Sequence, residues 1–552
     1  MGLRVRKKRN ASGSISIHIV DRTNRGYKVI ESLGSSKDEK EIEQLYNQAL
    51  QRIDELENNL LYTAKINEDQ KKLEELFSQI TTQDIISEGD EMVFGRLFDI
   101  IGCSKVFENN SSKNIRNKQE KNSLFRALVL SRIIYPGSKL ELINYLEYFK
   151  QKSISSDKIY RFLDTLYSHT VKQKIEECVF THTKEIMQGS IALTFYDVTT
   201  LHFESESEDD LRRIGFSKEG KLARPQIQLG LFTTLQGYPL SFEVYEGNKF
   251  EGHTLVDILQ KFQKKFHIKN KPIVVADKGM LNNANIAYLE ENGYKYILAY
   301  KIRHIEKELK EKIANLTFLD DGVIYTIEIE KEITYKDDKG KNQKRNIKQR
   351  LILTYSTKRA KKDKATREKA LKKISDTLNK KNITKSDLKL SYYAKYLDIV
   401  QTTLRNSASL HEDKCNIQYR LNPKKIEIDE KLDGVKGFAT NDFSLKANDV
   451  IAHYQNQYAV EKAFRISKTD LRIRPIYHRL ENRIKAHILV SFVAYAVYME
   501  FERRLKLKNI SFKFSQKLLR KIIEHFLVVK IGEKTIPIKP SDVQQQILKI
   551  FD

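Results

Sequence analysis

Residues 191–203, IALTFYDVTTLHF, decide the fold, because their polar and apolar positions alternate as in a half-buried β-strand. Leu193, Phe195 and Asp197 fall on one face of this predicted strand. An aspartate among apolar neighbours needs a partner, because burying an unpaired charge is costly. A metal ion is one such partner, so Asp197 is the first candidate ligand.

The segments that follow predict an α/β sheet in which a second aspartate lies next to Asp197. The expected elements are strands at 225–233 and 240–244, a helix through Leu255, Leu259 and Phe262, a buried strand at 273–276, a helix at 283–291 and a strand at 294–299. In this β-β-β-α-β-α-β order the first and fourth strands are expected to be neighbours. Asp277 follows the fourth strand at its carboxyl end, where α/β sheets bind ligands. Two adjacent carboxylates repel unless they share a proton or bind divalent cations.

A third acid lies in residues 448–468, NDVIAHYQNQYAVEKAFRISK, which we interpret as one helix. Steps of four, three, four and three residues place a stripe on one face of it: Tyr454, Tyr458, Glu461, Arg465 and Lys468. An exposed ion-pair face would explain this stripe equally well if no other acids converged on it. If the helix packs across the sheet edge, Glu461 completes a set of three carboxylates suited to two-metal phosphoryl transfer.

The sequence between and after these motifs predicts an interruption of the sheet. A hairpin is expected from strands at 323–335 and 345–355, followed by a basic helix at 358–381. A strand at 435–440 should re-enter the sheet. The helix expected at 484–501 contains the longest apolar run, which is far shorter than the ~20 residues of a membrane span, so it is predicted to be a buried core helix.

The N-terminal part predicts smaller units. Residues 3–33 favour an antiparallel meander with Ile15, Ile17 and Ile19 on one face and a turn at RTNRG. Residues 36–79 favour a long exposed helix, either a spacer or a coiled-coil dimerisation element. Residues 92–188 favour a helical region with Ser155 as a helix cap; it is a candidate for major-groove contact, although no helix-turn-helix signature is sharp.

Composition points to nucleic acid as the partner. Lys and Arg number 98 against 73 Asp and Glu, a net charge of +25. Such a balance favours polyanions; a membrane surface is the competing partner, and no signal-peptide core or membrane span accompanies it. The three cysteines, Cys103, Cys178 and Cys415, form no CxxC pair, so zinc and disulfides are not expected and any metal would have oxygen ligands.

Several sequence blocks together resemble DDE-class insertion-sequence transposases. They are TFYDVTTLHFES around Asp197, GFSKEGKLARPQIQLGLF, GYPLSFEVYEGNKFEGHTL, VVADKGMLNNANIAYLEENGYKYILA around Asp277, and the stripe around Glu461. One branch of that family carries Tyr, two residues, Arg, three residues, Glu, six residues, Lys around its third acid. Tyr454, Glu461 and Lys468 match this signature. Gln457 departs from it, since an amide replaces the expected arginine and contributes no charge.

The resemblance implies an α/β fold with an RNase H-like catalytic core, β-β-β-α-β-α-β then a helix, interrupted by a β-rich and basic insertion that helps shape the DNA channel. A small β meander and a helical DNA-binding region precede the core. The implied parts are 1–35 (β module), 36–90 (helical linker), 91–188 (helical DNA-binding domain), 189–300 (core, first part), 301–430 (insertion subdomain), 431–505 (core, second part) and 506–552 (C-terminal region).

The resemblance also implies the activity. The protein would bind the terminal inverted repeats of an insertion sequence, and cut and join strands at transposon ends and target DNA as a homodimer. It would use two Mg²⁺ ions, with Mn²⁺ as a substitute, held by Asp197, Asp277 and Glu461. DNA contacts would come from Tyr454, Gln457, Arg465 and Lys468, with Arg465 compensating for Gln457. The expected location is the nucleoid in a prokaryotic cytoplasm.

Two alternatives remain at this stage. One is an RNase H-like nuclease that hydrolyses strands without joining them, which the signature from Tyr454 to Lys468 disfavours. The other is a catalytically silent DNA-binding protein derived from a transposase, and the presence of all three acids argues against it.

Overall fold

The chain contains two compact units. The computed structural model describes all residues except 1, 23–25, 109–114, 190, 216–223, 269, 281, 319, 338–339, 379–394, 404–415 and 513–514. The first unit comprises Met1–Ile86 with Val528–Pro537, and the second comprises Ser87–Leu527 with Ile538–Asp552. Part of the predicted RTNRG turn, and Cys415, lie outside the described residues.

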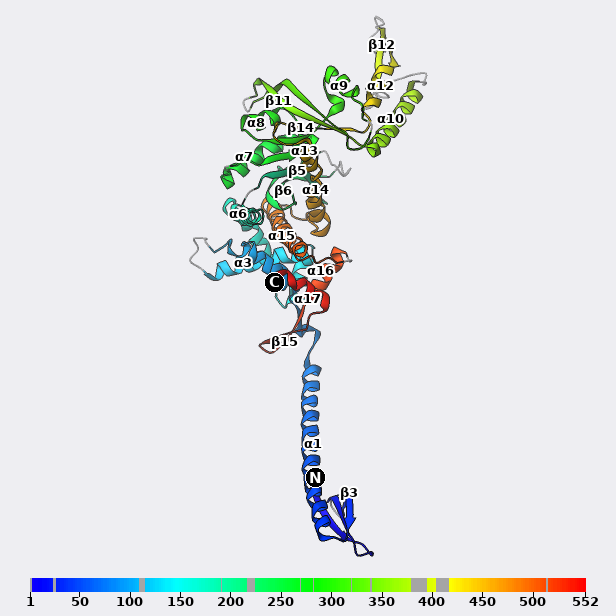
Figure 1. Cartoon of the computed structure of the whole chain (residues 1–552). Helices are drawn as coiled ribbons and strands as arrows, with labels where there is room; N and C mark the ends of the chain where they lie inside the picture. Colours follow the sequence, from blue (N-terminus) through cyan, green and yellow to red (C-terminus); the bar gives the residue numbers. More distant parts are fainter. Residues whose placement is uncertain are drawn as a thin grey trace. The chain divides into compact units, whose positions relative to one another are not determined.

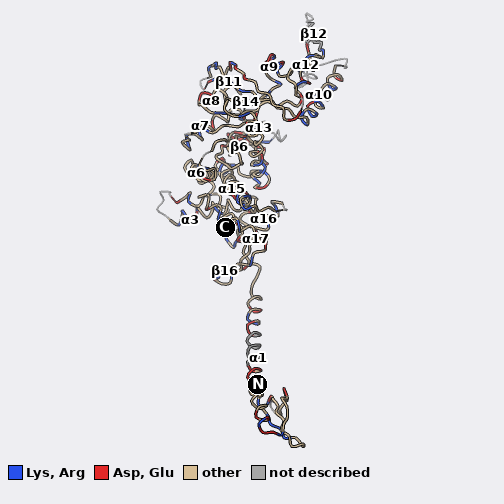
Figure 2. The backbone as a smooth tube through the Cα atoms, viewed as in Figure 1, with Lys and Arg blue, Asp and Glu red and all other residues tan. Residues whose placement is uncertain are grey.

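The first unit confirms the predicted meander and long helix. Its antiparallel sheet consists of β1 (Leu3–Arg9), β2 (Ile15–Asp21) and β3 (Lys28–Ser36). Helix α1 (Glu39–Gln79) begins at Asp38, whose side chain accepts a hydrogen bond from the Lys40 amide. Only its first turns pack on the sheet, where Ile42 and Ile53 share a small core with Ile17. Both acidic and basic residues occur along the described parts of the helix (Figure 2).

The C-terminal region contributes strands to this unit, which the sequence did not predict. A three-stranded sheet has the order β16-β15-β4, formed by β4 (Ile85–Ser87), β15 (Leu527–Ile531) and β16 (Lys534–Pro537). Strands β15 and β16 form a hairpin that turns at Gly532, where φ is +60° and the missing side chain avoids strain. Residues far apart in the sequence therefore pair here.

The second unit is a mixed α/β structure built on an eight-stranded sheet (Figure 1). The strand order is β10-β11-β14-β9-β8-β5-β6-β7. In chain order, the first five strands of this sheet are β5 (Leu193–His202), β6 (Gln226–Thr234), β7 (Pro239–Glu246), β8 (Ile273–Ala276) and β9 (Tyr296–Tyr300). Strands β5, β8 and β9 run parallel, and the two crossovers are α7 (Thr254–Phe266) and α8 (Asn283–Glu291). The predicted element order and the adjacency of the first and fourth strands are confirmed.

The predicted hairpin extends the core sheet and does not form a sheet of its own. Strands β10 (Ile324–Lys336) and β11 (Asn342–Tyr355) pair with each other, and β11 pairs with β14 (Val435–Thr440), which pairs with β9. The hairpin within 301–430 is thus part of the core sheet, and the boundaries expected for an insertion subdomain stay a prediction. In the sheet β14 lies between β9 and β11, so the hairpin supplies the partner for backbone groups of β14 that would otherwise form a free edge.

The rest of the insertion is helical and β-hairpin structure. Its further elements are α9 (Lys307–Ala314), α10 (Thr357–Leu378), β12 (Leu397–Thr403), β13 (Asn416–Leu421) and α12 (Pro423–Lys431). Helix α10 is the predicted basic helix, and its expected end at 379–381 lies outside the described residues. Strands β12 and β13 pair only with each other among the described strands.

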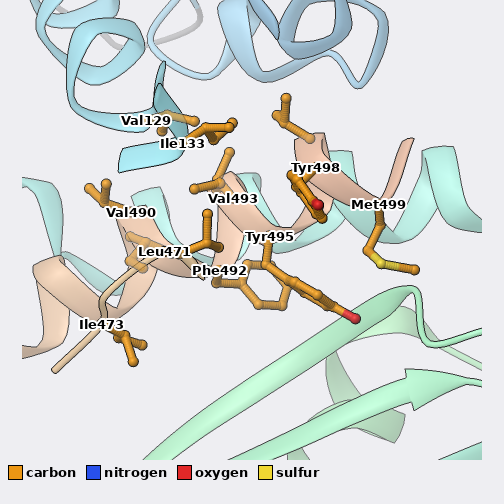
Figure 3. Packing of buried hydrophobic residues seen from close by; sticks show 14 of the residues in the cluster. Val129, Ile133, Leu471, Ile473, Val490, Phe492, Val493, Tyr495, Tyr498 and Met499 are labelled. Carbon is orange, nitrogen blue, oxygen red and sulfur yellow. The ribbon is translucent and has the colours of Figure 1, made fainter. Parts of the chain in front are cut away.

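Helix α15 (Glu481–Leu507) is the predicted buried core helix. Figure 3 shows Val490 and Val493 on the side of α3, near Val129 and Ile133. On the other side, the Tyr495 hydroxyl donates to the Gly237 carbonyl oxygen over 2.7 Å. By length and composition α15 could cross a membrane, but 94% of its most apolar window is buried inside the protein, which is typical of a core helix.

The helical region packs on α15 and shares a core with the sheet. Its main helices are α3 (Ile115–Ile134), α4 (Lys139–Lys150), α5 (Ser156–Leu166) and α6 (His169–Ile186). Ser155 caps α5 as predicted, accepting a hydrogen bond from the Lys158 amide. Phe125 of α3 and Phe195 of β5 belong to one hydrophobic cluster. The helical region 91–188 therefore shares its core with the sheet. Its contact with DNA stays a prediction.

Candidate active site

Asp197 and Asp277 lie side by side at one edge of the sheet. Tyr196 of β5 is in register with Ala276 of β8 in a parallel pair, so the next residue of each strand is an aspartate at the same level. Asp197 is half-buried in a strand whose other residues are all buried. Its Oδ1 accepts a hydrogen bond of 2.8 Å from the Val198 amide. The sequence-based placement of these two acids is confirmed by the register.

The predicted single helix at 448–468 is wrong in one respect: it is broken. Helix α13 (Ala447–Gln455) ends before α14 (Tyr458–Arg465), and a π-turn covers Ile466–Asp470. At the break, the Gln457 and Ala459 amides donate to carbonyl oxygens three residues earlier, which tightens the chain. Asn456 lies at this point, and asparagine is a poor residue for a helix interior.

The break places Glu461 in the first turn of α14. The opposite face of this helix is buried in the main core through Val460, Ala463 and Phe464. Glu461 itself is exposed. Core packing on the opposite face of α14 therefore holds the backbone that carries the Glu461 side chain.

All three predicted acids line one cavity of about 1610 Å³. Asp197 lies in the middle of β5, Asp277 directly follows β8, and Glu461 comes from α14. Within the described residues, however, no group of three or more His, Cys, Asp or Glu side chains lies close enough to hold a metal ion. The acids share a cavity without forming a closed set of ligands.

Tyr454 of α13 connects the helices to the sheet edge. Its hydroxyl donates to Asp277 Oδ1 over 3.1 Å, and its ring packs on Phe438 of β14 with centroids 4.8 Å apart. Burial raises the pKa of Tyr454 far above its usual value, and the negative charges of Asp277, Asp197 and Glu461 raise it further. The phenol therefore stays protonated and acts as a hydrogen-bond donor to the acid.

The other residues of the predicted stripe separate into two groups. Gln457 is 8% exposed and Tyr458 is 63% exposed, and both line the same cavity as the acids. Arg465 ends α14 and is exposed, while Lys468 is half-buried in the π-turn. Neither basic residue is among the described residues that line the cavity. The expected compensation of Gln457 by Arg465 has no support inside the cavity.

Residues 189–497 match the family described as Transposase DDE domain, a range that covers more than half of the 552 residues. The chain belongs to the DDE transposase family. The match includes all three acids and both parts of the sheet, and the large mixed sheet is consistent with a transposase RNase H-like core. The family assignment implies a phosphoryl-transfer enzyme.

Two further comparisons add little to the family assignment. The cryo-EM structure of a piggyBac transposase synaptic complex with hairpin DNA is similar at 9% sequence identity, over 79% of this chain and 77% of that chain, with a TM-score of 0.36. At these values the similarity supports neither a shared substrate nor a shared assembly. A comparison with curated protein sequences finds no match.

Sequence reasoning missed the basic residues of this DDE transposase cavity. Lys301, Arg359 and Lys436 line it and are exposed. Tyr300 of β9 pairs with Gly437 of β14, so continuing the antiparallel register places Lys301 opposite Lys436. Like charges on opposing strands repel, and a bound anion would relieve this. The sequence does show that Lys301 lies just after a predicted strand. The strand that pairs with it, and hence the position of Lys436, could not be inferred from the sequence.

Arg303 also lines the cavity, but it has a structural role. Its guanidinium forms ion pairs with Asp363, Asp429 and Asp433. These pairs connect the loop after β9 to α10 and α12. We therefore regard the exposed lysines, and not Arg303, as candidates for substrate contact.

Proposed function

We propose that this protein is a DNA transposase that binds the terminal inverted repeats of an insertion sequence and catalyses metal-dependent strand cleavage and strand transfer. The observation that carries the proposal is that Asp197, Asp277 and Glu461 line one cavity within the region that matches the DDE family. The parallel register of β5 and β8 supports the pairing of the two aspartates.

The donor set fits Mg²⁺, because it consists of carboxylates and DDE transposases typically use divalent metals. We infer that Asp197, Asp277 and Glu461 hold two such ions, for which Mn²⁺ is a substitute. The chemistry that such ions would supply when bound is activation of a water or 3′-hydroxyl and stabilisation of the leaving oxygen. Tyr454 holds the Asp277 carboxylate in one orientation through its hydroxyl.

The chemistry of the cavity suits double-stranded DNA as substrate. The acids lie near Tyr458 and Gln457, and the lysines Lys301 and Lys436 line the same cavity. Cationic side chains neutralise backbone phosphates, while the acids act at the scissile one. Tyr454, Gln457, Arg465 and Lys468 remain the proposed contacts to the transposon end. A homodimer on the DNA, and a place at the nucleoid of a prokaryotic cytoplasm, belong to the same proposal.

The test is a cleavage and joining assay with labelled element ends and a target plasmid in Mg²⁺ or Mn²⁺. The wild-type protein should cut the ends and join them to the plasmid. Asp197→Asn and Asp277→Asn should abolish both steps while DNA affinity stays near wild type, because metal ligation is lost. Asp210→Asn is the matched control, since this carboxylate is fully exposed in a polar loop.

Two results would contradict the proposal. Cleavage retained in either aspartate variant would remove that residue from the site. Cut ends without joined products would indicate a nuclease that hydrolyses DNA without strand transfer.

A further inference from the structure

A cluster of basic side chains is buried away from the acidic cavity, where α3, α4, α15 and the segment 471–480 meet. Its members are Arg132, Lys139, His478 and His487, which are between 4% and 8% exposed. Four basic groups in one apolar environment are unusual, because burial of a charge is costly without a counter-charge.

Hydrogen bonds fix the positions of two members. The Arg132 guanidinium donates through Nη1 to the Arg472 carbonyl oxygen over 3.3 Å, and its Nη2 lies 3.5 Å from His487 Nδ1. His487 Nε2 lies 2.8 Å from the Ile473 carbonyl oxygen, which can only accept. His487 is therefore neutral with its proton on Nε2, and Nδ1 accepts from Arg132. Nothing in this network neutralises the arginine charge.

The remaining donors lack partners. Arg132 Nε is buried without a hydrogen-bond partner, and Lys139 has neither a hydrogen bond nor an ion pair with any described residue. Burial lowers the pKa of Lys139 well below its usual value, and the charge of Arg132 adds to this. Burial, with the charges of Lys139 and Arg132, also lowers the pKa of His478 to about 4, so it is neutral.

Nearby carboxylates are engaged elsewhere. Asp164 accepts two hydrogen bonds from Arg483, at 2.6 and 2.7 Å. Glu141 accepts a hydrogen bond of 2.5 Å from the Ser138 amide and caps α4. The charge of Glu141 acts on Arg132 without direct contact, and neither Arg132 nor Lys139 forms an ion pair with a described residue.

The surface next to the cluster is basic and aromatic. Within 471–480, Ile473, Ile476 and His478 are buried, whereas Arg472, Tyr477 and Arg479 are exposed. Tyr477 is 68% exposed, which is unusual for a large aromatic side chain. Exposed arginine and tyrosine side chains are common contacts to nucleic-acid backbones.

We propose that this cluster is an anion site that receives a backbone phosphate of DNA, with Arg132 Nε and Lys139 Nζ donating to its oxygens. The inference rests on the proposed function, since it takes DNA as the partner. It adds a contact formed by residues that do not line the acidic cavity. The bound phosphate would supply a negative charge in direct contact with these donors, which no described carboxylate does.

The test compares Lys139→Met with Lys152→Met, an exposed lysine just after α4. The first measurement is the melting temperature in inorganic phosphate and in chloride at equal ionic strength. Phosphate should stabilise the wild-type protein and Lys152→Met, but not Lys139→Met. The second is the salt dependence of binding to a DNA duplex, where Lys139→Met should reduce the slope of log K against log [salt] by about 0.9.

Three outcomes would overturn the proposal. Phosphate could stabilise Lys139→Met as it does the wild type, or the salt slope could stay unchanged. Lys139→Met could also melt at lower temperature in chloride, which would make the ammonium a structural group, because removal of an unpaired buried charge should not destabilise. Cleavage plays no part in these measurements, so failure of the catalytic proposal is distinguished from failure of this site.

Discussion

The hydroxyl of Tyr454 gives the most direct test of how the acidic site is organised. Tyr454→Phe removes one oxygen and leaves the ring packed on Phe438. The hydrogen bond to Asp277 Oδ1 that this variant lacks is 3.1 Å long and has a charged acceptor, a type that contributes about 1.5–3 kcal/mol. Removal of such a hydrogen bond to a ligating carboxylate typically weakens metal binding by about 10- to 100-fold, which is about 1.4–2.7 kcal/mol. The two ranges agree, so we expect the Kd for Mn²⁺ to rise about tenfold.

The measurement is a titration of the protein with Mn²⁺ in the absence of DNA, followed by calorimetry or by the electron paramagnetic resonance signal of free Mn²⁺. Tyr458→Phe is the matched control, because Tyr458 lines the same cavity but is 63% exposed and makes no hydrogen bond to a described residue. Its Mn²⁺ affinity should equal that of the wild type. Unchanged Mn²⁺ affinity in Tyr454→Phe would refute the reasoning, because the hydroxyl would then have no effect on metal binding. Tighter Mn²⁺ binding would also refute it, because the hydroxyl would then compete with the metal for the Asp277 carboxylate.

Further predictions concern stability and DNA binding. Burial opposes ionisation of Glu500, but hydrogen bonds from Arg503 and its neighbours lower the pKa of this buried carboxyl to about 2 from 4.5. This shift should contribute about 3 kcal/mol that is present above pH 4.5 and lost as the pH falls towards 2, and urea unfolding of Glu500→Gln should lack this part of the pH dependence. Replacing Lys301 and Lys436 by alanine should reduce the salt slope of DNA binding by about 0.9 for each phosphate that is no longer neutralised, and an unchanged slope would exclude them from the interface. Gln457→Arg should tighten binding to element ends and steepen the salt slope, whereas weaker binding would show that the cavity does not accept a guanidinium at this position.

The order of the core strands could be predicted because it depends on local patterns. Alternation in 191–203 and the buried run before Asp277 each identify a strand without knowledge of the rest of the chain. Right-handed crossovers through α7 and α8 then leave few ways to arrange parallel strands. Asp197 and Asp277 were therefore placed side by side from sequence alone, and the register of β5 with β8 confirms this.

Contacts between distant segments could not be predicted in the same way. Tyr454 reaches Asp277 across 177 residues of sequence, and spacing on a helix says nothing about which strand end it meets. Lys301 lies opposite Lys436 only because of the register between β9 and β14. The cluster around Arg132 and Lys139 likewise could not be predicted from the sequence, because its members come from four separate segments.

The break between α13 and α14 had no clear sequence signal either, yet it bears on how the site works. In one continuous helix, Tyr454 and Glu461 would move together. In the structure they belong to different helices, so Tyr454 stays bonded to Asp277 while α14 is fixed through Val460 and its neighbours in the core. Glu461 is exposed and lines the cavity, and its side chain forms no hydrogen bond or ion pair with a described residue. Asp197 and Asp277 on neighbouring strands accept hydrogen bonds from the Val198 amide and the Tyr454 hydroxyl, whereas Glu461 accepts none from a described residue, and the three acids share a cavity in which the ligand set is still open.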